Sequence, residues 1–105
     1  MVEFERNFKT LGKYRIFKKD IFSAYKRIRK NMIFNNIDYV NLYNIKDELK
    51  MSFKDFEFML NRLAKDDNNR RKVFFNNIIA AVDHRKRFKV KNSAVLNIRI
   101  IKALT

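Results

Sequence analysis

One glycine and no proline occur in this chain of 105 residues. Glycine supplies positive φ angles and proline interrupts helices and strands, so few residues here force a break in the backbone. This composition excludes collagen-like, linker-rich and loop-rich proteins. The chain is instead rich in Lys, Asn, Phe and Ile, whose codons are AT-rich, and this bias is typical of an AT-rich genome such as that of a virus or mobile element.

Length and hydrophobicity indicate one folded domain over residues 1–105. Apolar residues make up 47% of the chain, with eleven Phe and four Tyr, which is too hydrophobic for a disordered basic tail. The absence of cysteine excludes disulfides and thiolate metal sites. The apolar runs are far shorter than the roughly 20 residues of a membrane span, and no signal peptide is visible. We therefore expect an intracellular protein, cytoplasmic or nucleoid-associated, with no membrane association, cofactor or metal.

The charge of +14 is distributed unevenly along the chain. Residues 1–30 hold ten Lys/Arg against three Asp/Glu, and residues 70–105 hold ten against one. Residues 31–69 are mildly acidic, with five Lys/Arg against seven Asp/Glu. Such a field attracts polyanions, and nucleic acid is the commonest polyanion that a small basic protein meets. The charge pattern favours a nucleic-acid-binding protein over an enzyme.

Helical spacing dominates the first third of the chain. Phe4, Phe8 and Leu11 fall on one face of a short helix that Gly12 would end, although the alternation at the N-terminus also fits a strand. Asp20 is a candidate N-cap for a second helix. The buried stripe of that helix would consist of Ile21, Tyr25, Ile28 and Met32.

The middle of the chain predicts a short strand followed by two helices. Residues 39–42 favour a strand, and Asn44 resembles the capped start of a two-turn helix. Ser52, with Asp55 three residues on, predicts the N-cap of a longer helix reaching Lys65. Its buried side chains would be Phe56, Met59, Leu60 and Leu63. Residues 66–69, all Asp or Asn, predict a turn.

The last third predicts a β-hairpin over residues 87–101. Residues 87–90 alternate between basic and apolar side chains, residues 91–93 form a turn, and Ala94, Leu96, Ile98 and Ile100 alternate again. Residues 73–75 and 78–82 fit either two strands or one buried helix. The expected fold class is therefore α+β, with three or four helices and a C-terminal hairpin.

From Tyr39 onward this order of elements resembles the winged helix-turn-helix domain. The resemblance is carried by residues 39–42, residues 44–51 and residues 52–65, with a wing inside residues 83–101. It implies a winged helix-turn-helix fold with an extra N-terminal helix and a C-terminal β-hairpin wing. It also implies DNA binding, with the second helix of the pair in the major groove.

Candidate nucleic-acid contacts come from four basic groups. On the expected recognition helix they are Lys54, Asn61, Arg62 and Lys65, beside the acidic Asp55 and Glu57. On the hairpin they are Arg85, Lys86, Arg87, Lys89 and Lys91. Further cations are Arg70, Arg71 and Lys72, and Lys26, Arg27, Arg29 and Lys30. The hairpin cations have fewer acids nearby, so we expect them to contribute more affinity for duplex DNA than Asn61 with Arg62.

Three alternatives stay open at this point. A small transcriptional regulator or replication accessory factor is favoured, but a viral or plasmid protein that blocks a host nucleic-acid machine has the same charge pattern. A ribonuclease-like toxin would have only His84 as an obvious general base. Phe53 and Phe58 are expected to pack in the core or against a second subunit, and the Phe4, Phe8 and Leu11 stripe could also form a homodimer.

Overall fold

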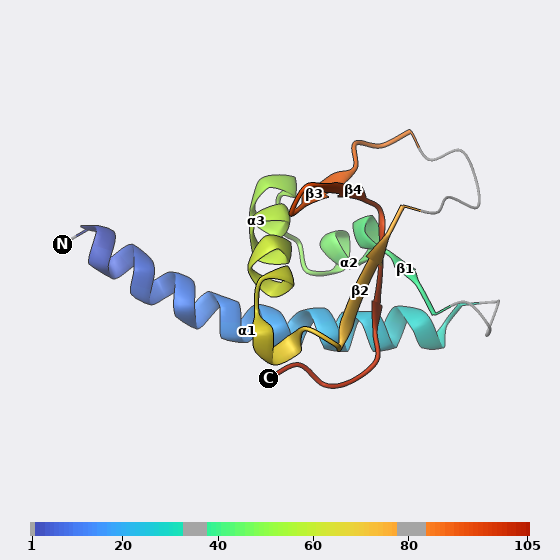
Figure 1. Ribbon diagram of the computed structural model, residues 1–105, viewed down its shortest axis with the longest axis horizontal. Helices are drawn as coiled ribbons and strands as arrows, with labels where there is room; N and C mark the ends of the chain where they lie inside the picture. Colours follow the sequence, from blue (N-terminus) through green and yellow to red (C-terminus); the bar gives the residue numbers. More distant parts are fainter. Residues whose placement is uncertain (1, 33–37, 78–83) are drawn as a thin grey trace.

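The computed structural model describes residues 2–32, 38–77 and 84–105, with side chains from residue 13 onward (Figure 1). Within these ranges the fold is mixed α+β, with three α-helices and small antiparallel sheets, as the sequence predicts. The elements are α1 (Val2–Lys30), β1 (Val40–Asn41), α2 (Leu42–Glu48), α3 (Phe53–Ala64), the 3₁₀ turn η1 (Asp67–Asn69), β2 (Val73–Asn76), β3 (Phe88–Val90), β4 (Ser93–Val95) and β5 (Asn97–Ile100).

α1 is one uninterrupted helix, so the predicted break at Gly12 and the predicted N-cap at Asp20 are both wrong. A single glycine inside a helix costs only about 1 kcal/mol relative to alanine, which packing can offset. That packing comes from the core face of the helix, where Phe17 and Ile21 are buried. The N-terminal end of α1 extends beyond the other elements (Figure 1). The side chains of the predicted Phe4, Phe8 and Leu11 stripe lie outside the described part of the structure.

Both central helices are present with side-chain caps. α2 begins at Leu42, earlier than the predicted start at Asn44, because the Asn41 side chain accepts a hydrogen bond from the Tyr43 amide at 2.8 Å. α3 begins after Ser52 as predicted, and the Ser52 hydroxyl oxygen accepts from the Asp55 amide at 3.2 Å. The four side chains expected to be buried on α3 are buried.

A three-stranded antiparallel sheet has the order β1-β5-β2. Val73 pairs with Ile100 at one end of the β2–β5 ladder, and Asn76 pairs with Asn97 at the other. Residues 73–75 are therefore a strand, which resolves the alternative left open by their sequence. Residues 78–82 lie outside the described residues.

A separate hairpin is formed by β3 and β4, joined by a two-residue turn at Lys91 and Asn92. Lys91 has a φ of 54°, in the left-handed region that such tight turns require. The prediction of one hairpin over residues 87–101 is thus wrong in its second half, because β5 joins β1 and β2 instead. Val95 and Leu96 are buried in succession while Ala94 is exposed, so the alternation breaks where the chain passes from one sheet to the other.

The core lies between α1, α2, α3 and the two sheets. Its largest fully buried side chains include Phe56 of α3, Phe88 of β3 and Ile21 of α1. Across the described ranges no helix is both long enough and apolar enough to cross a membrane.

Candidate nucleic-acid interface

A cluster of aromatic rings supports the β3–β4 hairpin. Phe53 of α3 stacks on Phe88 of β3 with ring centroids 4.5 Å apart, and Tyr43 of α2 lies 4.9 Å from Phe88. The Tyr43 hydroxyl donates a hydrogen bond to the Lys86 carbonyl oxygen. Because Phe88 is fully buried and also contacts Phe56, this cluster joins the hairpin to the core. Phe53 packs against the core, as its sequence context predicts.

Three basic residues preceding β3 are held against this cluster and the neighbouring backbone. The Arg85 guanidinium lies 4.2 Å from the centre of the Tyr43 ring, and the Lys86 ammonium lies 5.2 Å from that of Phe53. Arg87 donates hydrogen bonds of 2.9 Å to the Asn77 side chain and to the Arg85 carbonyl oxygen. Cation–π contacts keep a charge at the surface while restricting its side chain. The segment therefore presents cations in a restricted arrangement.

Two side chains of α3 satisfy the free backbone edge of β3. The Lys89 amide donates to the Glu57 carboxylate at 2.8 Å, and the Asn61 amide nitrogen donates to the Lys89 carbonyl oxygen at 2.8 Å. The Lys91 amide completes the set by donating to the Asn61 side-chain oxygen at 2.8 Å. An open strand edge needs such partners. Lys89 itself is exposed between the buried Phe88 and Val90, which confirms the predicted alternation.

These contacts change the roles expected for the outward face of α3. The sequence predicts that Asn61 faces outward as a donor to bases or phosphates, but it is half-buried and its amide is engaged by β3 and by the Glu57 carbonyl oxygen. Arg62 is also half-buried, with its guanidinium 4.6 Å from the Tyr14 ring centre. Helical spacing could not show this, because the covering strand comes from about thirty residues further along the chain. Lys54 and Lys65 are exposed as expected.

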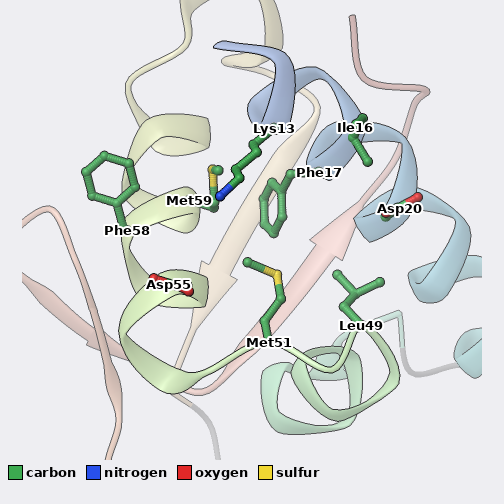
Figure 2. A pocket seen from close by; sticks show the side chains of 9 residues that line it. All are labelled: Lys13, Ile16, Phe17, Asp20, Leu49, Met51, Asp55, Phe58 and Met59. Atoms are coloured by element: carbon green, nitrogen blue, oxygen red, sulfur yellow. The ribbon is translucent and has the colours of Figure 1, made fainter. Parts of the chain in front are cut away.

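The sequence places Asp55 and Glu57 beside the cations of α3, but in the structure both acids have other surroundings. Glu57 accepts the hydrogen bond from the Lys89 amide, and its charge is thereby held against the backbone. Asp55 instead lines a hollow between α3 and α1 (Figure 2).

Two of the four basic residues at the end of α1 are bound to acids. Arg27 pairs with Glu48 of α2 at 2.6 Å, and Arg29 pairs with Asp38 at 3.0 Å. Arg99 of β5 approaches the same Asp38 at 3.6 Å. Lys26 lies 4.4 Å from the ring centre of Phe22, and Lys30 is exposed. Arg27 and Arg29 thus hold α1 against the strand and helix that follow it.

The third basic group lies away from the hairpin. Arg70, Arg71, Lys72 and Lys102 line a hollow of about 280 Å³ together with Asp67 and Asn68. The Lys72 ammonium also donates to the Thr105 hydroxyl oxygen at 3.3 Å. This hollow lies where β2 begins and β5 ends, whereas the β3–β4 hairpin lies beyond the other end of that ladder (Figure 1). This basic group and the hairpin cations therefore do not form one continuous face.

A polar network beside this hollow fixes the turn after α3. The Tyr14 hydroxyl donates to the Asp66 carboxylate at 2.7 Å, and the side-chain amide of Asn69 donates to the same carboxylate at 3.0 Å. Burial tends to raise the pKa of Asp66, but hydrogen bonds from Tyr14, the Asn68 amide and Asn69 lower that pKa below its usual value of 3.8. Burial, the hydrogen bond to Asp66 and its negative charge raise the pKa of Tyr14.

His84, the candidate general base, is exposed at the start of the segment that leads to β3. Among the side chains of residues 13–32, 38–77 and 84–105, no cluster of three or more His, Asp or Glu could hold a metal ion. Comparisons with models of protein families, with curated proteins and with solved structures find no match to this chain. Its function must therefore be inferred from its own side chains.

Proposed function

We propose that this chain is a small nucleic-acid-binding protein that holds the phosphate backbone of duplex DNA with the cations of residues 85–91. One observation carries the proposal. Lys86, Lys89 and Lys91 form no ion pair with any residue that the structure describes, although the hairpin and the segment leading to it are anchored to the core. Cations of this kind can release counterions from a polyanion when they bind it.

The order of elements supports a winged helix-turn-helix interpretation of the fold. β1, α2 and α3 are followed by a polar turn and then by strands, which is the order on which the resemblance rests. In this interpretation α3 is the second helix of the pair and the β3–β4 hairpin belongs to the wing. Lys54 follows Phe53 on α3 and would add a phosphate contact. Asn61 has no part in the interface, because β3 occupies its amide.

Duplex DNA is a better ligand for this surface than a single strand. Single-strand binding needs open aromatic rings on which bases stack. Here Phe88 is fully buried, and the rings of Tyr43 and Phe53 lie under Arg85 and Lys86. Phosphate contacts by cations give affinity and orientation without sequence choice. We therefore propose binding that varies little with DNA sequence, as in an architectural or replication accessory role.

A matched pair of charge variants tests the proposal. One variant replaces Lys86, Lys89 and Lys91 by Gln, and the control replaces Arg70, Arg71 and Lys102, which lie at the other end of the β2–β5 ladder. For the unmodified chain we expect log K to fall with log salt at a slope near −5 to −6, corresponding to about six phosphates. In the hairpin variant the slope should become shallower by about 2 to 3, and in the control by less than about 1.

The outcome separates a defined site from general attraction. Equal losses of DNA affinity and of salt slope in the two variants would mean that net charge alone drives binding, and the hairpin proposal would then be wrong. Tighter binding to single strands than to duplex would also contradict it. Cleavage of RNA that disappears in a His84→Ala variant would replace it with a ribonuclease function.

A further inference from the structure

A hollow separates α1 from the start of α3 on the side away from β3. Its cavity volume is about 370 Å³, and Figure 2 shows side chains from α1, α3 and the segment between α2 and α3 around it. Its lining includes Lys13, Ile16, Asp20, Asp55 and Phe58. We call it the α1–α3 groove.

Two large apolar side chains are exposed at this groove. Ile16 of α1 is 59% exposed and Phe58 of α3 is 56% exposed. Phe17 and Met59, which also line the groove, are buried. The sequence predicts that Phe58 packs in the core or against a second subunit, and its exposure excludes the first role. Exposed apolar side chains gathered around one hollow are typical of an interaction surface.

The charges around the groove differ from those of the rest of the molecule. Lys13, Asp20 and Asp55 are one base and two acids, in a chain whose net charge is +14. In the part of the chain that the structure describes, none of the three forms an ion pair. Like-charged copies of this protein repel one another, and that repulsion is weakest where acids are exposed. The groove is also a poor surface for a polyanion.

We propose that the α1–α3 groove binds a second copy of this chain, with the two α1 helices antiparallel across a two-fold axis near Ile16. Lys13 precedes Ile16 by three residues and Asp20 follows it by four, so all three share one stripe of the helix. An antiparallel copy places Lys13 opposite Asp20 of the partner subunit, and the symmetry produces this pair twice. A two-fold interface requires such a self-complementary pattern.

The groove and the β3–β4 hairpin lie on different faces of α3. Glu57 and Asn61 face β3, whereas Asp55 and Phe58 face the groove. Dimerisation would therefore leave both hairpins accessible. The inference does not depend on the proposed DNA binding, since its residues and its driving forces are separate.

Sedimentation equilibrium with charge-reversal variants tests the dimer. Over about 5 to 200 µM protein we expect a monomer–dimer equilibrium. Raising NaCl from about 0.15 to 0.5 M should strengthen it, because screening reduces the repulsion between two basic chains. Lys13→Asp and Asp20→Lys should each weaken dimerisation by about tenfold, since each creates like-charge pairs. The double variant exchanges the charges, and we expect it to recover dimerisation to within about threefold.

Two further variants control for folding and net charge. Ile16→Lys should be monomeric with an unchanged circular dichroism spectrum, because that side chain is exposed. Ile101→Lys, at a residue 46% exposed outside the groove, should dimerise normally. The proposal is overturned if the native chain stays monomeric at every protein and salt concentration. It is also overturned if the double variant dimerises no more tightly than the single variants. DNA binding by the double variant, whose net charge is unchanged, should equal that of the native chain in either case.

Discussion

The end of α1 and the β3–β4 hairpin contain basic runs that look alike in the sequence but are surrounded differently in the structure. At the end of α1, Arg27 and Arg29 contact the carboxylates of Glu48 and Asp38. On the hairpin, Lys89 and Lys91 form no ion pair with a described residue. Arg27 and Arg29 of the first run therefore tie α1 to its neighbours, whereas Lys89 and Lys91 remain accessible to a polyanion.

The acidic middle of the chain explains this difference. Its carboxylates at Asp38 and Glu48 lie on the segments that pack beside α1. Glu57, which lies nearest the hairpin, binds a backbone amide and not a basic side chain. The availability of a cation is therefore decided by which acids the fold places beside it, and a charge run by itself does not reveal this.

The largest effect is expected from removing the aromatic support of the hairpin. Phe88 is fully buried and contacts Phe53, Phe56 and Tyr43. Phe88→Ala should lower the free energy of unfolding by about 3 to 5 kcal/mol, measured by urea denaturation. Ile21→Val in α1 is a milder core control and should cost about 1 kcal/mol. A loss for Phe88→Ala no larger than that of the control would show that the hairpin is not anchored through this ring.

A smaller loss should follow from removing the α3 contact with the edge of β3. Asn61→Ala leaves the Lys89 carbonyl oxygen and the Lys91 amide without their α3 partner. We expect a decrease of about 1 to 3 kcal/mol in the free energy of unfolding. Amide hydrogen exchange at Lys91 should accelerate in the same variant. Unchanged exchange there would mean that Asn61 is free to contact DNA, as its position on the helix first suggested.

Local sequence signals predicted the parts of the fold that depend on nearby residues. The Ser52 cap, the buried stripe of α3 and the alternation of residues 88–90 are all confirmed. The predictions of a helix end at Gly12 and a helix start at Asp20 are wrong. These local signals are weaker than the packing of one long helix against the core. The division of the C-terminal strands depends on pairing between β2 and β5, which no local pattern encodes.

The candidate site was only partly predictable for the same reason. The hairpin cations could be identified from their spacing. The engagement of Asn61 by β3 and of Arg29 by Asp38 depends on contacts between distant segments. The role of Phe58 was partly predictable, since a large apolar residue among polar neighbours on a helix indicates either a buried position or a protein–protein interface.

Removing the acids beside α1 would test whether ion pairs within the fold keep the cations of α1 from binding DNA. Asp38→Asn with Glu48→Gln removes the charge of the two carboxylates that contact Arg29 and Arg27. We expect affinity for duplex DNA to rise about three- to tenfold, with a steeper salt dependence. The control variant Asp20→Asn with Asp55→Asn changes the net charge equally but leaves the ion pairs of Arg27 and Arg29 in place. Equal gains in both would show that net charge alone sets the affinity. Binding should be measured at nanomolar protein, where dimerisation does not contribute.

The smallest effect is expected at Asp66, which also belongs to the acidic middle of the chain. Its described hydrogen bonds come from a hydroxyl and from amides, whereas Asp38 and Glu48 contact arginines. Its lowered pKa means that the ionised form is favoured by folding. The resulting stability is present above the usual value of 3.8 and is lost as the pH falls through the still lower pKa of the folded state. Asp66→Asn should therefore be less stable than the native chain at pH 7, by about 1 kcal/mol or less, and the difference should shrink below pH 3.8. Thermal melts at several pH values measure this, and moderate salt should change the difference little because hydrogen bonds at short range carry it. A difference that stays constant with pH would show that the ionised carboxylate contributes nothing, and that packing alone holds η1 against Tyr14.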